Sequence, residues 1–117
     1  MAEYRRLDIN EVGDVTVVRF RDQKIVEDIN IHELGRELLR LTDVDHREKL
    51  LLNFSAVDFL SSAALGQLIT LDKKIKANNG ALKLSNICPE IYEVFTITKL
   101  DLLFDIKEDE ADALAAF

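Results

Sequence analysis

Two adjacent serines, Ser61 and Ser62, stand in the segment FLSSAALG, between an apolar run and a stretch with the spacing of an amphipathic helix. A helix start needs only one side-chain oxygen to accept from its free backbone N–H groups, so one hydroxyl is enough as a cap. The second is therefore either idle or available for chemistry. It could act as a nucleophile, or it could accept a phosphate at the positive end of the helix dipole.

Nucleophilic catalysis is the weaker of these two hypotheses. A serine nucleophile needs a general base within reach, and an α/β hydrolase presents it in a G-x-S-x-G turn. The serine pair has neither flanking glycines nor a neighbouring histidine, and His32 could approach only through the fold. Nucleotide-binding loops are excluded too, because they need clustered glycines. The four glycines are far apart, at Gly13, Gly35, Gly66 and Gly80. We expect neither enzyme activity nor a cofactor.

Composition narrows the class of partner. The chain has 117 residues, which predicts one domain over residues 1–117. Its 15 basic and 22 acidic residues give a net charge of −7, which opposes binding to nucleic acid and to anionic membranes. No apolar run approaches the roughly 18 residues that span a bilayer, and the N-terminal segment MAEYRRLDINE lacks the apolar core of a signal peptide. We therefore expect a cytoplasmic location.

The remaining reactive side chains are interpreted as structural. Cys88 is the only cysteine, which excludes an intramolecular disulfide and a multi-cysteine metal site. It directly precedes Pro89, which suits the first position of a helix, so we interpret Cys88 as a half-buried apolar residue at a loop-to-helix junction. His32 and His46 have no second ligand at metal spacing and are predicted to lie on the surface.

The elements that must position the serines follow from hydrophobic periodicity. Residues 28–43 have an apolar side at Ile31, Leu34, Leu38 and Leu41, opposite Glu33, Arg36, Glu37 and Arg40. Residues 49–54 form a continuous apolar run, typical of a central strand that is buried on both faces. The predicted strands are 4–10, 14–20, 49–54, 81–84 and 102–106, and the predicted helices are 28–43, 62–78, 89–98 and 108–116. The order ββαβαβαβα predicts an α/β fold in which about four helices cover a mixed sheet of four to five strands, parallel in its later strands.

This order places the two serines at a functional edge. They follow the carboxyl end of the apolar strand and begin helix 62–78, which is where α/β sheets usually present functional groups. The helix face just beyond them is small and nearly neutral, with Ala63, Gly66, Gln67 and Thr70. Two interpretations stay open from the residues alone. Either Ser61 is the cap and Ser62 an ordinary first-turn residue, or one of the two accepts a phosphate.

At this point the chain resembles a known family. Residues 57–66 (VDFLSSAALG), 79–87 (NGALKLSNI) and 91–100 (IYEVFTITKL) are similar to a STAS domain of the anti-sigma factor antagonist family. The family loop reads approximately Asp-Ser-Ser/Thr-Gly-Leu-Gly, and its first serine is phosphorylated. Aligned on Leu65 and Gly66, that serine falls on Ser62, with Ser61 as second choice.

The resemblance implies a partner switch. The unphosphorylated domain would bind a protein that is both anti-sigma factor and serine kinase and so free a sigma factor. Phosphorylation would weaken this complex, and a phosphatase would reset it. The kinase would supply ATP and Mg²⁺. The implied partner surface contains Ser61, Ala63, Gly66, Gln67 and Thr70, with Glu27 and Asp28 matching a second acidic position of the family.

Three residues depart from the family loop: Ser61 replaces the aspartate, Ala63 follows the acceptor, and Ala64 replaces a glycine. These departures favour an alternative, a constitutive STAS scaffold or sensor module without a phosphoswitch. A small-molecule or lipid-handling accessory role is a third hypothesis. A phosphoryl-accepting receiver domain is disfavoured, because Phe54 and Ser55 end the central strand where an aspartate would be needed. The oligomeric state stays open between a monomer and a weak dimer.

Overall fold

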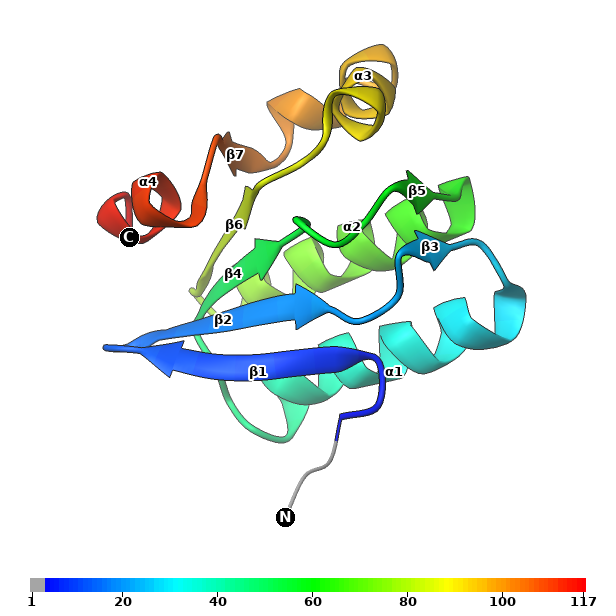
Figure 1. The fold of residues 1–117 in the computed structure, drawn as a ribbon. Coiled ribbons are helices and arrows are strands. Elements are labelled where there is room, and N and C mark those ends of the chain that lie inside the picture. Colours follow the sequence, from blue (N-terminus) through cyan, green and yellow to red (C-terminus); the bar gives the residue numbers. More distant parts are fainter. Residues whose placement is uncertain (1–3) are drawn as a thin grey trace.

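The computed structural model describes residues 4–117, so the first three residues of the expected domain lie outside it. Figure 1 shows the arrangement of the elements. The strands are β1 (Leu7–Val12), β2 (Val15–Phe20), β3 (Lys24–Ile25), β4 (Lys49–Asn53), β5 (Phe59–Leu60), β6 (Ala81–Ser85) and β7 (Asp105–Lys107). The helices are α1 (Asp28–Asp43), α2 (Ser62–Ala77), α3 (Pro89–Ile97) and α4 (Glu110–Ala115), with a 3₁₀ helix at Leu100–Leu102.

Five strands form the main sheet, in the order β1-β2-β4-β6-β7. β1 pairs antiparallel with β2, and each later pair is parallel. The register aligns Val18 with Leu52 and Leu52 with Leu84, so apolar side chains form a row across the sheet. The predicted mixed α/β fold is confirmed, with β4 as its central strand. Between residues 4 and 117, no helix is both long and apolar enough to cross a bilayer.

The two faces of the sheet carry cores of unequal size. Helices α1 and α2 lie side by side and cover one face, where Leu50 and Leu52 of β4 are fully buried. Leu51 points to the opposite face and packs in a smaller cluster with Val17 and with Ala113 of α4. Strand β4 is therefore buried on both faces, as its continuous apolar run predicts.

The position of Glu37 differs from the side of α1 on which the sequence predicts it. The helical spacing predicts it on the solvent side, but it is buried and its carboxylate accepts a hydrogen bond from the Arg6 backbone N–H at 3.0 Å. The segment before β1 covers this flank of the helix, a tertiary contact that periodicity does not show. The predicted outward position is wrong because a backbone donor replaces the water that the carboxylate would otherwise need.

The last strand is shorter than the sequence predicts, because β7 begins only at Asp105 and not at Leu102. Leu102 belongs to the 3₁₀ helix instead, and it is 80% exposed. The chain turns at Lys99, whose φ of 62° lies in the left-handed region, and it reaches the sheet later than the apolar pattern suggests. Helix α4 also starts later than predicted. Asp109 caps it by accepting from the Asp112 backbone N–H, so residues 108 and 109 are not helical.

Candidate functional site

The two serines occupy different positions at the start of α2. Ser61 is the N-cap residue, with an extended backbone, and its Oγ accepts a hydrogen bond from the Ala64 backbone N–H at 3.2 Å. Ser62 is the first residue of the helix and its side chain is exposed. One hydroxyl is therefore used as the cap, and its neighbour faces solvent.

A short second sheet, not predicted from the sequence, holds the loop before α2. Strands β3 and β5 pair in parallel and align Ile25 with Leu60. The Ser61 N–H donates to the Ile25 carbonyl at 3.0 Å, and the Asp58 N–H donates to the Gln23 carbonyl at 2.8 Å. Two-residue strands are too short to show a periodic pattern, so sequence reasoning had no signal for this pairing.

This pairing brings the predicted site residues to one end of the molecule. Helix α1 starts three residues after β3, and α2 starts two residues after β5. Both helices therefore begin near the β3–β5 pair (Figure 1). Glu27 is at the N-cap position of α1, Asp28 lies in its first turn, and both side chains are exposed. We call this region, made of residues 24–29 and 59–62, the serine edge.

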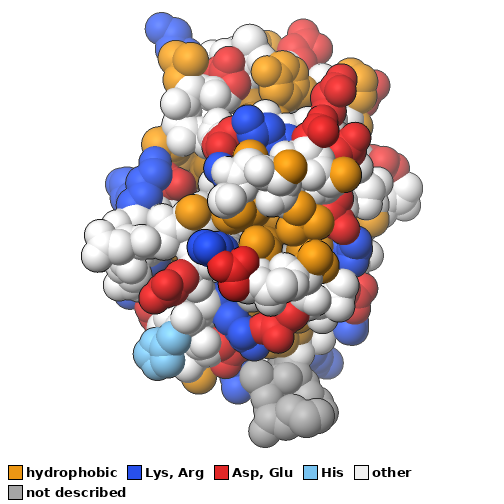
Figure 2. Space-filling model, turned by 90° about the vertical axis from the view of Figure 1, so that its left-hand side faces the viewer, with side chains coloured by type: hydrophobic (Ala, Val, Ile, Leu, Met, Phe, Trp, Pro, Cys, Tyr) orange, Lys and Arg blue, Asp and Glu red, His pale blue; other side chains and the backbone are white. Residues whose placement is uncertain are grey.

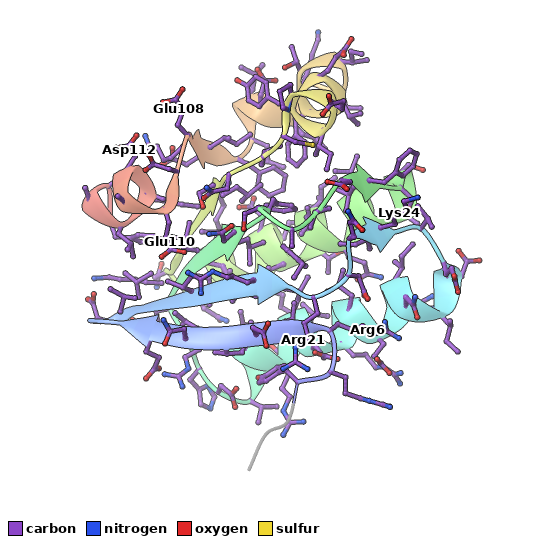
Figure 3. The ribbon with its side chains drawn as sticks, in the orientation of Figure 1. Arg6, Arg21, Lys24, Glu108, Glu110 and Asp112 are labelled. Atoms are coloured by element: carbon purple, nitrogen blue, oxygen red, sulfur yellow. The ribbon has the colours of Figure 1, made fainter. Side chains whose placement is uncertain are left out.

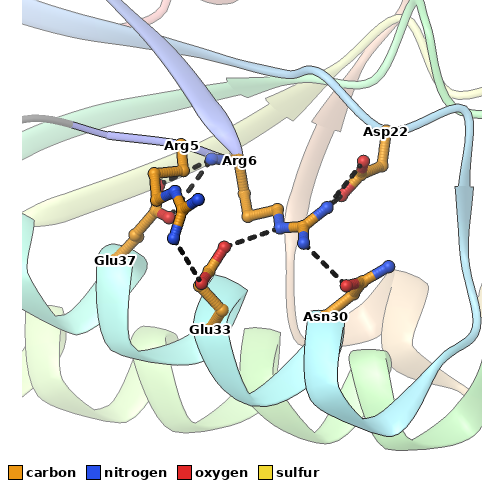
Figure 4. A network of polar contacts seen from close by, with 6 residues as sticks. All are labelled: Arg5, Arg6, Asp22, Asn30, Glu33 and Glu37. Atoms are coloured by element: carbon orange, nitrogen blue, oxygen red, sulfur yellow. Dashed lines mark hydrogen bonds and ion pairs between the residues drawn. The ribbon is translucent and has the colours of Figure 1, made fainter.

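Arg6 lies next to this edge and connects the segment before β3 with helix α1, and Figure 4 shows its contacts. Its Nε donates to Glu33 at 2.8 Å, one terminal nitrogen donates to Asp22 at 3.1 Å, and the other donates to Asn30 at 2.7 Å. The hydrogen bond to Glu33 raises the pKa of Arg6, and the charge of Asp22 adds to this effect. Asp22 lies just before β3, whereas Asn30 and Glu33 belong to α1. Arg6 therefore connects the segment before β3 with helix α1. Arg6 leaves no recognisable signal in the sequence, since these partners lie 16 to 27 positions away.

The helix face beyond the serines combines open and half-buried positions. Gly66 and Thr70 are exposed, and the Thr70 hydroxyl donates to the Gly66 carbonyl at 3.0 Å. Ala63 is also exposed. Gln67, predicted to face outward, is half-buried instead. Its side chain occupies the space that a Cβ on Gly35 would need, so the absence of a side chain at that glycine admits it.

A groove runs along the contact between α1 and α2. Its volume is about 450 Å³, and it is lined by His32, Gly35, Arg36, Leu39 and Gln67. His32 is exposed in this groove, and His46 is exposed in the loop after α1, as expected for both. Cys88 is half-buried at the N-cap position of α3, as its place before Pro89 predicts.

Some of the exposed apolar side chains lie in the serine edge. Val26, Ile29 and Phe59 are all among the exposed large hydrophobic residues, and they lie in the segments that β3 and β5 bring together. Within residues 4–117 no three His, Cys, Asp or Glu side chains gather as a metal site would require. The arrangement can thus present a free hydroxyl and a contact surface to another protein.

Comparison with known proteins agrees with this architecture. The STAS domain family model matches residues 6–113. A protein of Bordetella bronchiseptica described as an anti-sigma factor antagonist, BtrV, is 30% identical over 95 residues, which is 81% of each chain.

Solved structures share the fold at lower identity. A STAS domain protein from Planctomyces limnophilus has a TM-score of 0.84 and 22% identity, covering 94% of this chain and 96% of its own. The phosphorylated form of the Bacillus cell fate determinant SpoIIAA has a TM-score of 0.71 and 16% identity, with coverage of 94% and 97%. A chain of the stressosome has a TM-score of 0.70 and 21% identity, with coverage of 93% and 94%. With the family model covering nearly the whole chain and the relative in agreement, this protein belongs to the STAS domain family of anti-sigma factor antagonists.

Proposed function

We propose that this protein works in a partner switch controlled by phosphorylation of Ser62. In its unphosphorylated form it binds an anti-sigma factor that is also a serine kinase, and so regulates transcription. A phosphate on Ser62 weakens that complex, and a separate phosphatase removes it. The protein then acts as one cytoplasmic domain that serves as ligand and substrate and does no chemistry of its own.

The exposed hydroxyl of Ser62 is the observation that carries this proposal. The cap hydrogen bond occupies Ser61, which makes Ser61 the second choice of acceptor. Ser62 has no such role and stands at the helix N-terminus, where the dipole stabilises a phosphate of charge about −1.5 to −2. The fold can therefore accept the modification without rearrangement.

A phosphate would change the surface that a partner meets. Ala63, Gly66 and Thr70 bear no charge, whereas Glu27 and Asp28 already make the neighbouring part of this edge negative. The added negative charge at Ser62 would repel an acidic partner group and would be costly to bury against an apolar one, so it would weaken a complex that fits the uncharged face closely.

Mass spectrometry of the protein isolated from its own cells tests the proposal. Trypsin releases residues 50–73, which contain Ser55, Ser61, Ser62 and Thr70. Fragment ions that place a phosphate on Ser62 are the expected result. A peptide that stays unmodified during growth and under stress would contradict the switch.

A second candidate is a constitutive scaffold or sensor module in a signalling assembly. The loop favours it, because Ser61 and Ala64 stand where the family carries aspartate and glycine. The likeness to a stressosome chain also supports it, although at 21% identity that likeness concerns the fold. This candidate predicts the same partner whether or not Ser62 is modified.

A further inference from the structure

Helix α4 contacts the sheet through a carboxylate that binds two strands at once. Glu110 is its first residue and turns toward the sheet, whereas Glu108 and Asp112 point away from it (Figure 3). The Glu110 Oε1 accepts from Arg19 of β2 at 2.7 Å and from the Asn53 side-chain amide of β4 at 2.9 Å. The start of α4 is thus attached to two neighbouring strands.

Asn53 extends this contact to the loop that leads to the serines. It is buried at the end of β4, and its Oδ1 accepts from the Ser55 backbone N–H at 2.8 Å. The same side chain therefore binds α4 through its nitrogen and the loop of residues 54–61 through its oxygen. A flipped amide would place its oxygen against the Glu110 carboxylate, so Glu110 selects the orientation that supports the loop.

We propose that Glu110 and Asn53 are positioning residues that couple the docking of α4 to the conformation of residues 54–61, and hence to the presentation of Ser62. The part that concerns Ser62 rests on the proposed function, while the coupling to the loop stands on the hydrogen bonds themselves. When α4 is docked, the Asn53 amide is oriented and the loop is ordered. When α4 leaves the sheet, both hydrogen bonds of Glu110 are lost and the amide is free to rotate.

Helix α4 should separate from the sheet more readily than α1 or α2. It has six residues, well below the roughly 12 that give an isolated helix marginal stability, and its docked face depends on the small cluster of Val17, Leu51 and Ala113.

Figure 2 looks onto the side of the molecule where α4 and the β1–β2 turn lie. Apolar side chains gather in the middle of this face, with charged groups around them. Leu114 and Phe117 are only partly buried against the cluster under α4. Since few apolar groups seal this helix, its opening should need less free energy than unfolding of the main core.

Amide hydrogen exchange, measured by NMR on the full chain, tests the coupling. Glu110→Ala should speed exchange at the Ser55 amide by about tenfold, the effect expected when one hydrogen bond loses its support. Glu110→Gln keeps an acceptor for Asn53 and should restore the exchange rate to within about twofold. Asp112→Ala removes a charge from the same helix without touching the sheet, so it should leave Ser55 unchanged.

The Asn53→Asp variant gives a second test of the coupling. Its carboxylate can still accept from the Ser55 N–H, but it repels the Glu110 carboxylate and so favours undocking of α4. We expect the Ala113 methyl resonance to shift toward its solvent-exposed position while the Ser55 amide stays protected from exchange. Unchanged Ser55 exchange in Glu110→Ala would overturn the proposal, as would an equal rise at the amides of Leu38 and Leu71, which would indicate general destabilisation. Failure of Glu110→Gln to restore protection would do the same. None of these measurements requires phosphorylation. A peptide without phosphate would therefore contradict the phosphorylation switch, while the exchange rates would still test the coupling between α4 and the loop.

Discussion

At the scale of single residues, one position separates a structural serine from an available one. Ser61 lies outside the helix, where its Oγ can reach back to the Ala64 N–H. Ser62 lies inside the first turn, where its side chain is exposed to solvent. Two chemically identical side chains therefore have different roles because the helix starts between them.

Replacing each serine by alanine should separate these roles. Ser61→Ala removes the cap and should lower the free energy of unfolding by about 1 kcal/mol. Ser62→Ala should change it by less than about 0.5 kcal/mol, since it removes no hydrogen bond of the fold. Urea unfolding followed by circular dichroism measures both. Equal losses would show that Ser62 also supports the helix start.

Substitutions at Ser62 should change the affinity for the proposed anti-sigma partner, although they hardly change stability. Ser62→Asp introduces part of the charge of a phosphate and should weaken the complex by about tenfold or more, whereas Ser62→Ala should bind like the unmodified protein. Titration calorimetry with the purified partner measures this difference. Equal affinities for the two variants would remove Ser62 from the mechanism.

At the scale of elements, the serine edge is assembled from two segments that are distant in sequence. The β3–β5 pair and Arg6 together place the start of α1 beside the start of α2. Neither helix could establish this arrangement alone, because the β3–β5 hydrogen bonds run between the segments that precede the helices and the Arg6 hydrogen bonds come from the segment before β1.

Arg6 and Arg5 form a matched pair for testing this assembly. Arg6→Met leaves the carboxylates of Glu33 and Asp22 without their guanidinium partner and should cost about 1–3 kcal/mol. The Arg5 side chain is 80% exposed and lies 3.8 Å from Glu33, so Arg5→Met should stay within about 0.5 kcal/mol. Thermal unfolding compares the two variants, and faster amide exchange at Ser61 in Arg6→Met would connect the loss to the β3–β5 pair. Similar small effects of both substitutions would show that the network contributes little.

The ion pair between β6 and β7 should make the free energy of unfolding fall at acidic pH. A hydrogen bond from Lys83 holds the pKa of Asp105 below its ordinary value of 3.8, with a further contribution from Lys107. Because this pKa is lowered in the folded state, its stabilising effect is present above pH 3.8 and is lost as pH falls through the folded value. The difference in unfolding free energy between the unmodified protein and Asp105→Asn should therefore shrink below about pH 4. A difference that stays constant as the solution is acidified from neutral pH would contradict this.

At the scale of the whole molecule, the residues that stabilise the fold and the residues of the candidate site lie in different regions. The large core between the sheet and α1 and α2 contains fully buried residues such as Leu52 and Leu38, while the serine edge exposes Ile29 and Phe59. Neither Ile29 nor Phe59 belongs to the buried clusters, so both are available for contact with a partner.

Two alanine substitutions test this separation. Leu52→Ala should cost about 2–5 kcal/mol, because it leaves a cavity in the main core. Ile29 is 74% exposed, so Ile29→Ala should change stability by less than about 0.5 kcal/mol. Chemical denaturation of both variants measures the contrast. A loss of more than about 1 kcal/mol in Ile29→Ala would show that the exposed edge also supports the fold.

Periodicity and local chemistry determined most of the architecture in advance. The helical spacing of Ile31, Leu34 and Leu38 and the apolar run of β4 predicted elements that the structure confirms, because burial against one common core imposes those patterns. The serine pair at the start of α2 also followed from the sequence. Local composition marks helix starts well, since caps need short polar side chains.

Only the tertiary structure decided which distant residues come together, both at the serine edge and in the rest of the fold. The β3–β5 pair, the burial of Glu37, the packing of Gln67 against Gly35, and the contact of Glu110 with Asn53 all join positions that are far apart in the chain. Each depends on a few hydrogen bonds or on one close approach, and such isolated contacts leave no repeating pattern in the sequence. The chain by itself therefore determined the elements and the two serines. The folded molecule decided the surroundings of those serines, because contacts between distant segments form only once the elements have packed.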